Sequence, residues 1–282
     1  MDFSRFSAEG ASFSIGCVPG ADNIKLFEIH YRPANPSPFP PLIFLPGWVS
    51  IIDSWENVLK EMTKDFEIYY LETREKGSAK HPVEQDLSIA SLGDDLSSVL
   101  VYHNLFDKPY ILFGSSLGGT VILDAMSKMK VSPTMAVLIG PNAEFQAPRY
   151  WLWIIRMVPP ILFYFIKPLA KWYMKKKYIN MEADPKQYEK YARALDQGNP
   201  SRMRRSALNC SKYKIWEKLG NIHQKVLIFT GSQDVLHGYE NTVKIAELLP
   251  NCELVDLVTN ARTHSVEMVN QLRSFLKEDV NV

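Results

Sequence analysis

The sequence predicts a doubly wound, mostly parallel α/β sheet that carries an inserted all-helical segment. Near-continuous apolar runs, which suit strands buried on both faces of a sheet, recur along the 282 residues. Amphipathic helical patterns lie between these runs, as a doubly wound sheet requires. The alternation stops once, from about Phe145 to Trp216, where aromatic and basic helical patterns are separated by prolines and no strand pattern occurs. With 46% hydrophobic and 22% charged residues, the composition is that of an ordinary globular protein.

The expected elements follow one another in regular order along the chain. Strands are predicted at Ile24–Tyr31, Pro41–Pro46, Phe66–Glu72, Tyr110–Gly114, Met135–Gly140, Val226–Gly231 and Cys252–Leu257. Helices are predicted at Ser54–Lys64, Leu87–Leu105, Thr120–Lys130, Asn241–Leu249 and Val266–Lys277. These elements leave residues 145–216 outside the alternating pattern.

The inserted segment also differs from the rest of the chain in charge. Between Phe145 and Lys214 there are 15 Lys and Arg and only 4 Asp and Glu, although the whole chain has a net charge of +1. We therefore expect an α/β core formed by residues 1–144 and 217–282, and a basic helical cap of residues 145–216 over the end of the sheet. The near-neutral total gives no indication of a nucleic-acid partner.

Cysteine usage and the N-terminal residues indicate a reducing compartment. Cys17, Cys210 and Cys252 are odd in number, far apart and without a CxxC pair, which argues against a disulfide framework and a zinc site. The N-terminal stretch "MDFSRFSAEGASF" lacks the apolar centre of a signal peptide. We expect a cytoplasmic protein without a metal.

The stretch "GSSLGG", residues 114–119, matches the pattern G-x-S-x-G with Ser116 at its centre. A nucleophilic serine on a sharp strand-to-helix turn needs glycines two residues before and after it, because side chains there would collide with neighbouring backbone. A strand pattern precedes the turn and a helical pattern follows it. The loop fails both phosphate-binding patterns, G-x-G-x-x-G and G-x-x-x-x-G-K-[ST]. We therefore predict Ser116 as a nucleophile and Ser115 as a bystander, the remaining alternative being an inert turn.

The motifs together resemble those of the α/β-hydrolase-fold serine hydrolases over nearly the full length of the chain. "LPGW" (Leu45–Trp48) stands where that family usually has His-Gly and an aromatic residue. "ETREKGSA" (Glu72–Ala79) resembles a diverged D-x-R-G-x-G-x-S motif, and Leu87–Leu105 resembles the helix that leads into the nucleophile strand. Haloalkane dehalogenases and epoxide hydrolases of this fold have Asp at the turn, so Ser116 excludes them.

A serine nucleophile requires a base and an acid. His264 follows the last predicted strand, at the carboxyl edge of the sheet, and the resemblance implies the chain order Ser, acid, His. We predict His264 as the base, with His237 as its rival. Asp234 follows a buried strand after a short turn, at the position where the resemblance implies the acid. The alternatives are a purely local turn role for Asp234 and the use of Glu144 as the acid.

The oxyanion of the reaction requires backbone N–H donors. Leu117, directly after the nucleophile, is expected to supply one, and the family pattern points to Trp48 for the other. Pro46 replaces the common His of that loop, which leaves the loop's supporting hydrogen bonds unassigned. No cofactor is implied.

The stretch Arg149–Tyr178 is rich in aromatic and basic residues. Arg156 and the Pro159–Pro160 pair interrupt its apolar run, which is shorter than the roughly 20 residues of a membrane span. Seven basic and no acidic residues lie between positions 145 and 181, as in a helix bound to an anionic bilayer surface. The competing interpretation, which the sequence favours, is that the apolar face packs onto the core and covers its pocket while the lysines are solvated. In either case we expect an apolar substrate pocket with walls that include Trp151, Ile155, Phe163 and Trp172.

These expectations define an esterase- or lipase-like hydrolase of carboxylic esters with a hydrophobic, medium or long acyl chain. Two alternatives stay open. The same triad could serve carbon–carbon bond hydrolysis or acyl transfer, which would require polar anchors in the cap. The fold could also be a non-catalytic binding module, although such modules commonly lose a triad member.

Overall fold

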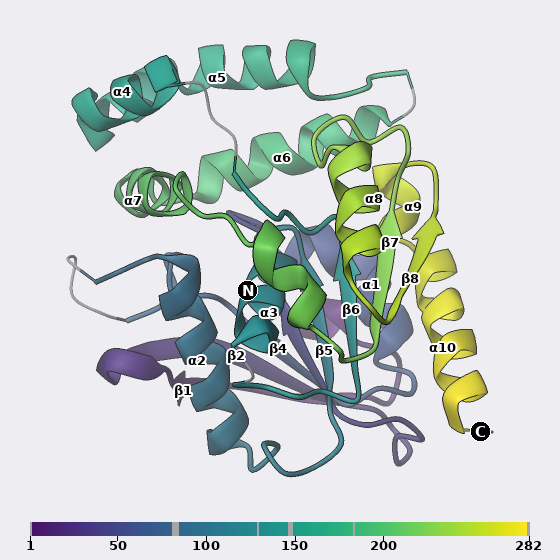
Figure 1. Ribbon diagram of the computed structural model, residues 1–282. Coiled ribbons are helices and arrows are strands. Elements are labelled where there is room, and N and C mark those ends of the chain that lie inside the picture. The colour runs from purple at the N-terminus through teal and green to yellow at the C-terminus, as the bar shows by residue number, and fades with distance from the viewer. Residues whose placement is uncertain (1, 81–84, 129, 146–148, 183, 281–282) are drawn as a thin grey trace.

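The computed structural model describes residues 2–80, 85–128, 130–145, 149–182 and 184–280. Its centre is an eight-stranded sheet in the order β1-β2-β4-β3-β5-β6-β7-β8, with helices on both faces (Figure 1). The strands are β1 (Ser12–Pro19), β2 (Lys25–Arg32), β3 (Leu42–Leu45), β4 (Ile68–Leu71), β5 (Ile111–Ser115), β6 (Met135–Ile139), β7 (Val226–Thr230) and β8 (Cys252–Asp256). All seven strands expected from the apolar runs are present, and the predicted doubly wound fold is confirmed.

The sheet is parallel from β4 to β8 and antiparallel at the N-terminal edge. β1 pairs with β2 and β2 pairs with β4 in antiparallel register, while the other neighbours run parallel. The sequence analysis missed β1. This strand lies at the edge of the sheet with most of its residues exposed, so it lacks the continuous apolar run that marks the buried strands.

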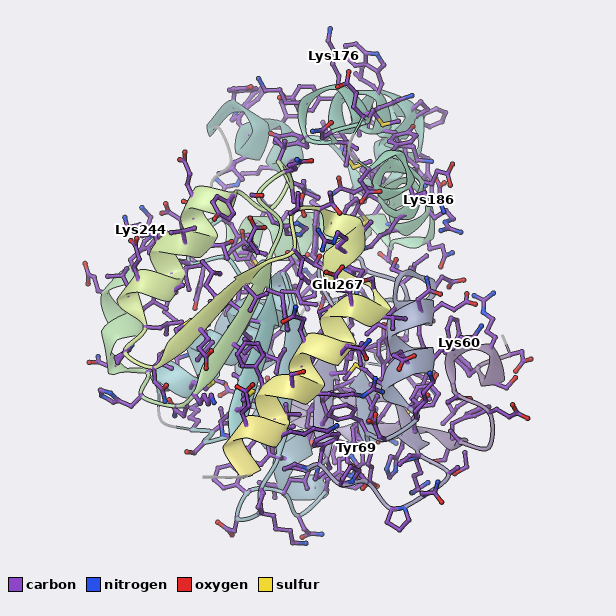
Figure 2. All side chains as sticks on the ribbon, turned by 90° about the vertical axis from the view of Figure 1, so that its right-hand side faces the viewer. Lys60, Tyr69, Lys176, Lys186, Lys244 and Glu267 are labelled. Atoms are coloured by element: carbon purple, nitrogen blue, oxygen red, sulfur yellow. The ribbon has the colours of Figure 1, made fainter. Side chains whose placement is uncertain are left out.

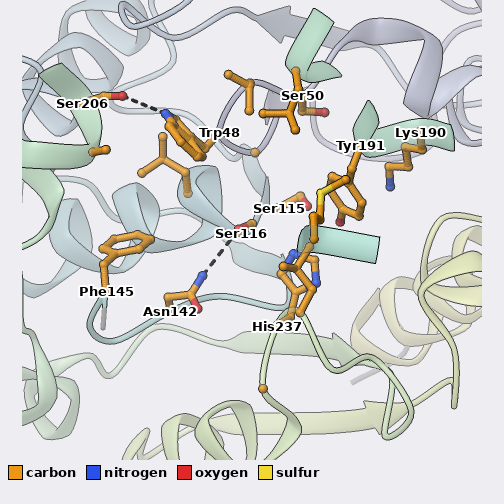
Figure 3. Close-up of a pocket in the computed structure, with 18 of the residues that line it drawn as sticks. Trp48, Ser50, Ser115, Ser116, Asn142, Phe145, Lys190, Tyr191, Ser206 and His237 are labelled. Carbon is orange, nitrogen blue, oxygen red and sulfur yellow. Dashed lines mark hydrogen bonds between the residues drawn. The ribbon is translucent and has the colours of Figure 1, made fainter. Parts of the chain in front are cut away.

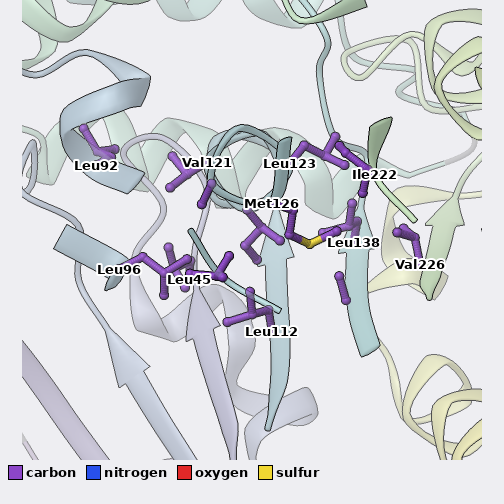
Figure 4. Packing of buried hydrophobic residues seen from close by; sticks show 14 of the residues in the cluster. Leu45, Leu92, Leu96, Leu112, Val121, Leu123, Met126, Leu138, Ile222 and Val226 are labelled. Atoms are coloured by element: carbon purple, nitrogen blue, oxygen red, sulfur yellow. The ribbon is translucent and has the colours of Figure 1, made fainter. Parts of the chain in front are cut away.

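The helices of the core cover the two faces of the sheet. They are α1 (Glu56–Met62), α2 (Ile89–Tyr102), α3 (Leu117–Ser127), α8 (Tyr239–Leu248), α9 (Asn260–Thr263) and α10 (Val266–Val280). Alternate residues of β5 enter opposite apolar clusters, because successive side chains of a strand point to opposite faces. Leu112 packs in the cluster that includes α2 and α3 (Figure 4), and Phe113 packs in the cluster that includes α1 and α10.

Between β6 and β7 the described residues form helices and no strand. We call α4 (Arg149–Met157), α5 (Phe163–Lys177), α6 (Pro185–Gln197) and α7 (Pro200–Cys210) the cap helices. α4 and α5 form the outermost layer, and α6 and α7 lie between them and the sheet (Figure 1). These helices occupy the segment predicted as a cap; the exact division at residues 145 and 216 stays a prediction.

Proline and capping residues determine where the inner cap helices begin. Pro185 and Pro200 are the first residues of α6 and α7, where a missing N–H costs nothing. The side chains of Asp184 and Asn199 cap these two helices by accepting backbone N–H bonds. In the part of the chain that the structure describes, no helix is long and apolar enough to cross a membrane.

Candidate active site

Ser116 stands at the turn between β5 and α3, in a strained backbone conformation. Its φ and ψ are 48° and −111°, a region that non-glycine residues rarely adopt. The turn is held by the Ser116 N–H, which donates to the Ile139 carbonyl at 2.8 Å. α3 begins at Leu117, three residues earlier than the predicted Thr120, so the first free N–H groups of the helix lie directly beside Ser116.

The two glycines of the motif are required by close backbone approach. A Cβ atom at Gly114 would lie 2.7 Å from the Gly118 carbonyl carbon and from the Gly119 nitrogen, closer than real Cβ atoms come to other atoms. A Cβ atom at Gly118 would overlap the carbonyl oxygen of Leu45 at the end of β3. The spacing G-x-S-x-G is therefore explained by the packing of this turn against β3 and α3.

The loop after β3, which is expected to supply the second oxyanion donor, lies against the nucleophile. A Cβ atom on Gly47 would be 3.3 Å from the Ser116 Cβ. The support that Pro46 cannot provide comes from Lys76, whose ammonium donates to the Gly47 carbonyl at 2.7 Å and to the Ser50 carbonyl at 2.6 Å. Burial lowers the pKa of Lys76. Sequence reasoning did not identify Lys76, because the motif resemblance gave this position no role.

Asn142, which follows β6, is a second residue that the sequence analysis did not single out. Its side-chain Nδ2 lies 3.5 Å from the Ser116 Oγ (Figure 3). Thr120 holds it in place, since its hydroxyl accepts from the Asn142 N–H at 3.1 Å and donates to the Asn142 carbonyl at 2.9 Å. The rule that ligand sites form at the carboxyl ends of parallel strands could have found this residue.

Asp234 lies after β7, buried as expected, but its partner differs from the prediction. Its Oδ2 is 2.7 Å from the His237 Nδ1 and accepts from the Asn260 Nδ2 at 2.7 Å, while its Oδ1 accepts from the Gln187 Nε2 at 3.0 Å. Among the described residues no hydrogen bond joins Asp234 to His264. Burial by itself would raise the pKa of Asp234, but His237 and these hydrogen bonds outweigh it and hold the pKa well below its usual range.

His264 is oriented by the backbone instead of by the carboxylate. Its Nδ1 lies 3.0 Å from the Asn260 carbonyl and 3.0 Å from the Thr263 hydroxyl, and its ring packs 4.3 Å from the Trp55 ring. A donor role for Nδ1 toward the carbonyl leaves Nε2 free to accept a proton. Burial, followed by the positive charge of Lys190, lowers the pKa of His264 well below its usual value. The ring is therefore neutral at neutral pH.

Helix α6 of the cap brings polar side chains into the site. Gln187 binds Asp234, and Lys190 and Tyr191 line the same cavity as Ser116, as Figure 3 shows. None of the three was singled out from the sequence, because they are separated from the triad candidates by more than forty residues and reach the site only through the docking of the cap.

The cavity above Ser116 has a volume of about 490 Å³ and is mostly apolar. It is lined by residues that follow β3, β5, β6, β7 and β8, including Trp48, Leu117, His237 and His264, and by residues of the cap helices. A cavity of this size is typical of sites for small organic ligands. The arrangement thus places a serine, two histidines and the expected oxyanion donors around one space.

The pocket residues predicted from the cap sequence are only partly found in the cavity wall. Ile155 lines it, together with Leu152 and Met174. Phe163 and Trp172 are not among its lining residues, and Trp172 is 55% exposed. The side chain of Trp151 lies outside the described residues. The expectation for Phe163 and Trp172 is therefore wrong: of the residues of α5, Met174 reaches the cavity wall, and these two do not.

Glu144 and the remaining histidines were the other candidates for roles in the site. Glu144, the fallback acid, lines the cavity and forms an ion pair with Lys214 at 3.2 Å. Three of the other histidines lie elsewhere: His30 contacts Glu67, His103 contacts Glu28, and His223 lies outside the cavity wall. His81 lies outside the described residues. Within the described ranges, no group of three or more His, Cys, Asp and Glu could hold a metal ion.

A family model described as the alpha/beta hydrolase fold matches residues 40–261. The chain therefore belongs to the α/β-hydrolase fold family. No curated protein sequence matches it.

Solved structures resemble this chain over almost its whole length. One is the esterase RhEst1 from Rhodococcus sp. ECU1013, with a TM-score of 0.73 and 20% identity over 94% of this chain and 98% of that one. Another is a hydrolase from Pseudomonas aeruginosa PA01, with a TM-score of 0.73 and 16% identity over 95% and 97%. A third is the enol-lactonase from Burkholderia xenovorans LB400, with a TM-score of 0.66 and 13% identity over 97% of both chains. At these identities the likeness concerns the fold.

Proposed function

We propose that the protein is a serine hydrolase that cleaves carboxylic esters with a hydrophobic acyl chain. The observation that carries the proposal is the position of Ser116 on a strained turn, open to a mostly apolar cavity that two histidines share. Family membership and the esterase and lactonase among the similar structures agree with hydrolase chemistry. The apolar cap residues Leu152, Ile155 and Met174 would accommodate the acyl chain.

In the proposed reaction a histidine accepts the Ser116 proton as the Oγ attacks the ester carbonyl. The tetrahedral oxyanion is held by the N–H groups of Leu117 and Trp48. The protonated histidine then gives its proton to the leaving alcohol, and water cleaves the resulting acyl-enzyme by the same steps in reverse. Apart from water, the proposed steps use the side chains and amides of this site.

We propose His264 as the base, on its place after the last strand and on its free Nε2. Its neutral state at neutral pH suits a proton acceptor. His237 is the alternative, favoured by its 2.7 Å contact with Asp234, which is the contact that a triad acid makes. Asp234 then acts on His237 directly, and on His264 only through the common hydrogen-bond partner Asn260.

The proposal is tested with p-nitrophenyl esters from acetate to palmitate and with a fluorophosphonate probe. We expect activity that peaks at medium or long chains and labelling of the wild-type protein. Ser116→Ala abolishes both, whereas Ser115→Ala, its neighbour, retains labelling. A protein labelled at Ser116 but inactive on every ester would indicate a different bond, such as a carbon–carbon bond, or acyl transfer. A protein that is not labelled at all would be a binding module.

The base is assigned by comparing His264→Ala with His237→Ala. We expect loss of roughly a thousandfold or more in kcat for His264→Ala, the usual magnitude for a member of a triad. His237→Ala should cost far less, through a displaced Asp234. The opposite ranking would transfer the role of base to His237 without changing the role of Ser116.

We also propose that α4 and α5 bind an anionic lipid surface. Of the 19 large apolar side chains that are exposed in the described residues, 11 lie between Tyr150 and Tyr178. The most exposed are Phe165 at 78% and Trp153 at 65%. A monomeric protein rarely exposes so many large apolar groups in one region, unless the region is a contact surface.

The charges near this region favour an anionic bilayer over an apolar protein partner. Lys175, Lys176 and Lys177 are exposed at the C-terminal end of α5, and Figure 2 shows Lys176 at the outer tip of the cap. Each such lysine contributes about 1 kcal/mol near an anionic membrane surface. The cytoplasm remains the proposed location, where the inner leaflet supplies that charge.

The lipid contact is tested by sedimentation with vesicles of phosphatidylglycerol and of phosphatidylcholine. Binding should require phosphatidylglycerol and weaken with salt, and the triple variant Trp153→Ser, Phe165→Ser, Leu169→Ser should lose it. A matched control replaces Val101 and Tyr102, which are exposed on α2 at 61% and 53%. Equal loss in the control variant, or equal binding to both lipids, would contradict the proposal.

A further inference from the structure

Lys190 is a cationic side chain inside the cavity of the proposed active site. It belongs to α6 and lines the cavity together with Ser116 and His264, as Figure 3 shows for Lys190 and Ser116. Its Nζ lies 5.6 Å from the centre of the Trp55 ring and 5.4 Å from the centre of the Tyr191 ring. Two aromatic faces therefore flank the ammonium group, an arrangement that stabilises a cation.

This cation has no carboxylate partner among the described residues. Within the described residues its ammonium donates a hydrogen bond to the neutral Asn260 Oδ1, at 3.5 Å. The nearby Asp184 and Asp234 use their oxygens elsewhere, in the cap of α6 and in the contacts of Asp234 with His237, Asn260 and Gln187. An ammonium group has three donors and is costly to bury without an acceptor. The cavity that contains Ser116 thus also contains a cationic side chain with unused donors.

Two lysines of the outer cap helix α5 have the carboxylate partner that Lys190 lacks. Lys167 and Lys171 both pair with Asp196, at 3.5 and 2.6 Å. Lys190 differs because it lines the cavity and pairs with no carboxylate of the described residues.

We propose that Lys190 binds an anionic oxygen group of the substrate, a carboxylate or a phosphate, while Ser116 attacks the ester carbonyl of the same molecule. The inference rests on the proposed ester hydrolysis and narrows it to amphiphilic esters that combine an apolar chain with a negative charge. The ammonium donates to the anion, and such a charge-assisted hydrogen bond is stronger than one between neutral groups.

The pH dependence of this preference has a definite sign. Burial lowers the pKa of Lys190 to about 7, against the opposing influence of Asp234 and Asp184. An anion binds to the protonated amine, so the preference for an anionic substrate should decline as the pH rises through about 7. The titratable groups around the amine are Asp184 and Tyr191 on α6, Asp234 and His237 after β7, and His264 before α10.

The test compares two esters of equal chain length, p-nitrophenyl octanoate and the mono-p-nitrophenyl ester of octanedioic acid. We expect the ratio of kcat/KM, anionic over neutral ester, to fall by about tenfold or more in Lys190→Met, the usual scale for a lost charge-assisted hydrogen bond. Lys190→Arg should retain most of the ratio. Lys186→Met removes an exposed charge from the same helix and should leave the ratio unchanged.

The outcomes separate this inference from the proposed function. If neither ester is cleaved by the wild-type protein, the ester hydrolase proposal fails. If the octanoate is cleaved but the ratio is equal in the wild type and Lys190→Met, only the role of Lys190 is overturned. Inhibition of octanoate cleavage by octyl phosphate and by octanedioate then compares the two anions. If inhibition by at least one of them is weaker in Lys190→Met than in the wild type, the inference is supported. If inhibition by both is unchanged in Lys190→Met, the inference is contradicted.

Discussion

The inner and outer helices of the cap make very different contacts. In α6 and α7, Gln187 binds the buried Asp234, and Ser206 accepts the Trp48 indole N–H at 2.7 Å. In α5, no residue is buried. α4 and α5 reach the rest of the protein through the inner helices, for instance where the Arg204 guanidinium of α7 donates to the Ile155 carbonyl at 2.7 Å. The inner layer therefore supplies the polar contacts of the site, whereas the outer layer adds only the apolar wall residues Leu152, Ile155 and Met174 and leaves most of its large side chains exposed.

The largest difference is expected in stability. Met203 of α7 is 6% exposed and Met157 of α4 is 61% exposed, which makes them a matched pair in the two layers. Met203→Ala should lower the free energy of unfolding by about 2–5 kcal/mol, because it leaves a cavity in packed surroundings. Met157→Ala should change it by less than about 0.5 kcal/mol. Urea denaturation measures both, and similar losses would show that the two layers are equally packed.

A smaller but more specific effect concerns Gln187. Gln187→Leu removes an N–H donor from a buried carboxylate and should lower kcat on p-nitrophenyl butyrate by about 10- to 100-fold, the scale of one hydrogen bond to a charged group. Trp172→Ser on α5 serves as the control and should leave this kcat unchanged. A full effect at Trp172 would mean that the outer layer also positions the site.

The bond between α7 and the oxyanion loop should contribute less. Ser206→Ala leaves the Trp48 indole N–H without its acceptor, next to the backbone N–H expected to bind the oxyanion. We expect kcat to fall by only about two- to fivefold, the scale of one neutral hydrogen bond. The measurement is the same esterase assay, with Ser201→Ala at the exposed start of α7 for comparison. A loss of kcat as large as that for Gln187→Leu would contradict the expectation that this bond contributes less than the one to Asp234.

The smallest expected effect is a shift of the pH profile. The base must be neutral to act, and the pKa of His264 is held low by burial and by the charge of Lys190, so kcat/KM should persist below the usual histidine range. Lys190→Met removes the positive charge and should move the acidic limb to higher pH. Lys175→Met on α5 should not. A fixed limb in Lys190→Met would show that the two groups do not interact, or that another histidine is the base.

Sequence reasoning predicts those features of this protein that depend on residues close to one another in the chain. The seven buried strands follow from apolar runs, and the place of Ser116 follows from glycine spacing that the packing explains. The edge strand β1 was not predicted, because a strand with mostly exposed residues needs no continuous apolar run. Its sequence therefore indicates a strand only weakly.

The parts of the site that sequence reasoning missed depend on contacts between distant segments. The family resemblance and the chain order implied a pair of Asp234 and His264, but the loop after β7 turns so that His237, three residues after Asp234, contacts the carboxylate. Gln187 and Lys190 enter the site only because α6 lies over the sheet, and a helical pattern does not encode where a helix docks. Their roles require three-dimensional coordinates.

The lysine that supports the oxyanion loop has a consequence for protein engineering. The Arg202 guanidinium of α7 donates to the carbonyls of Lys76 and Ala79, while the Lys76 ammonium donates to the Gly47 carbonyl beside the nucleophile. Arg202 of the cap thus holds the backbone of Lys76 in place, and Lys76 in turn holds the loop that contains Gly47. A cap grafted from another family member would have to bring an equivalent of Arg202, or the recipient would keep its fold and lose the geometry of its catalytic loop. In this chain the cap is not an exchangeable module.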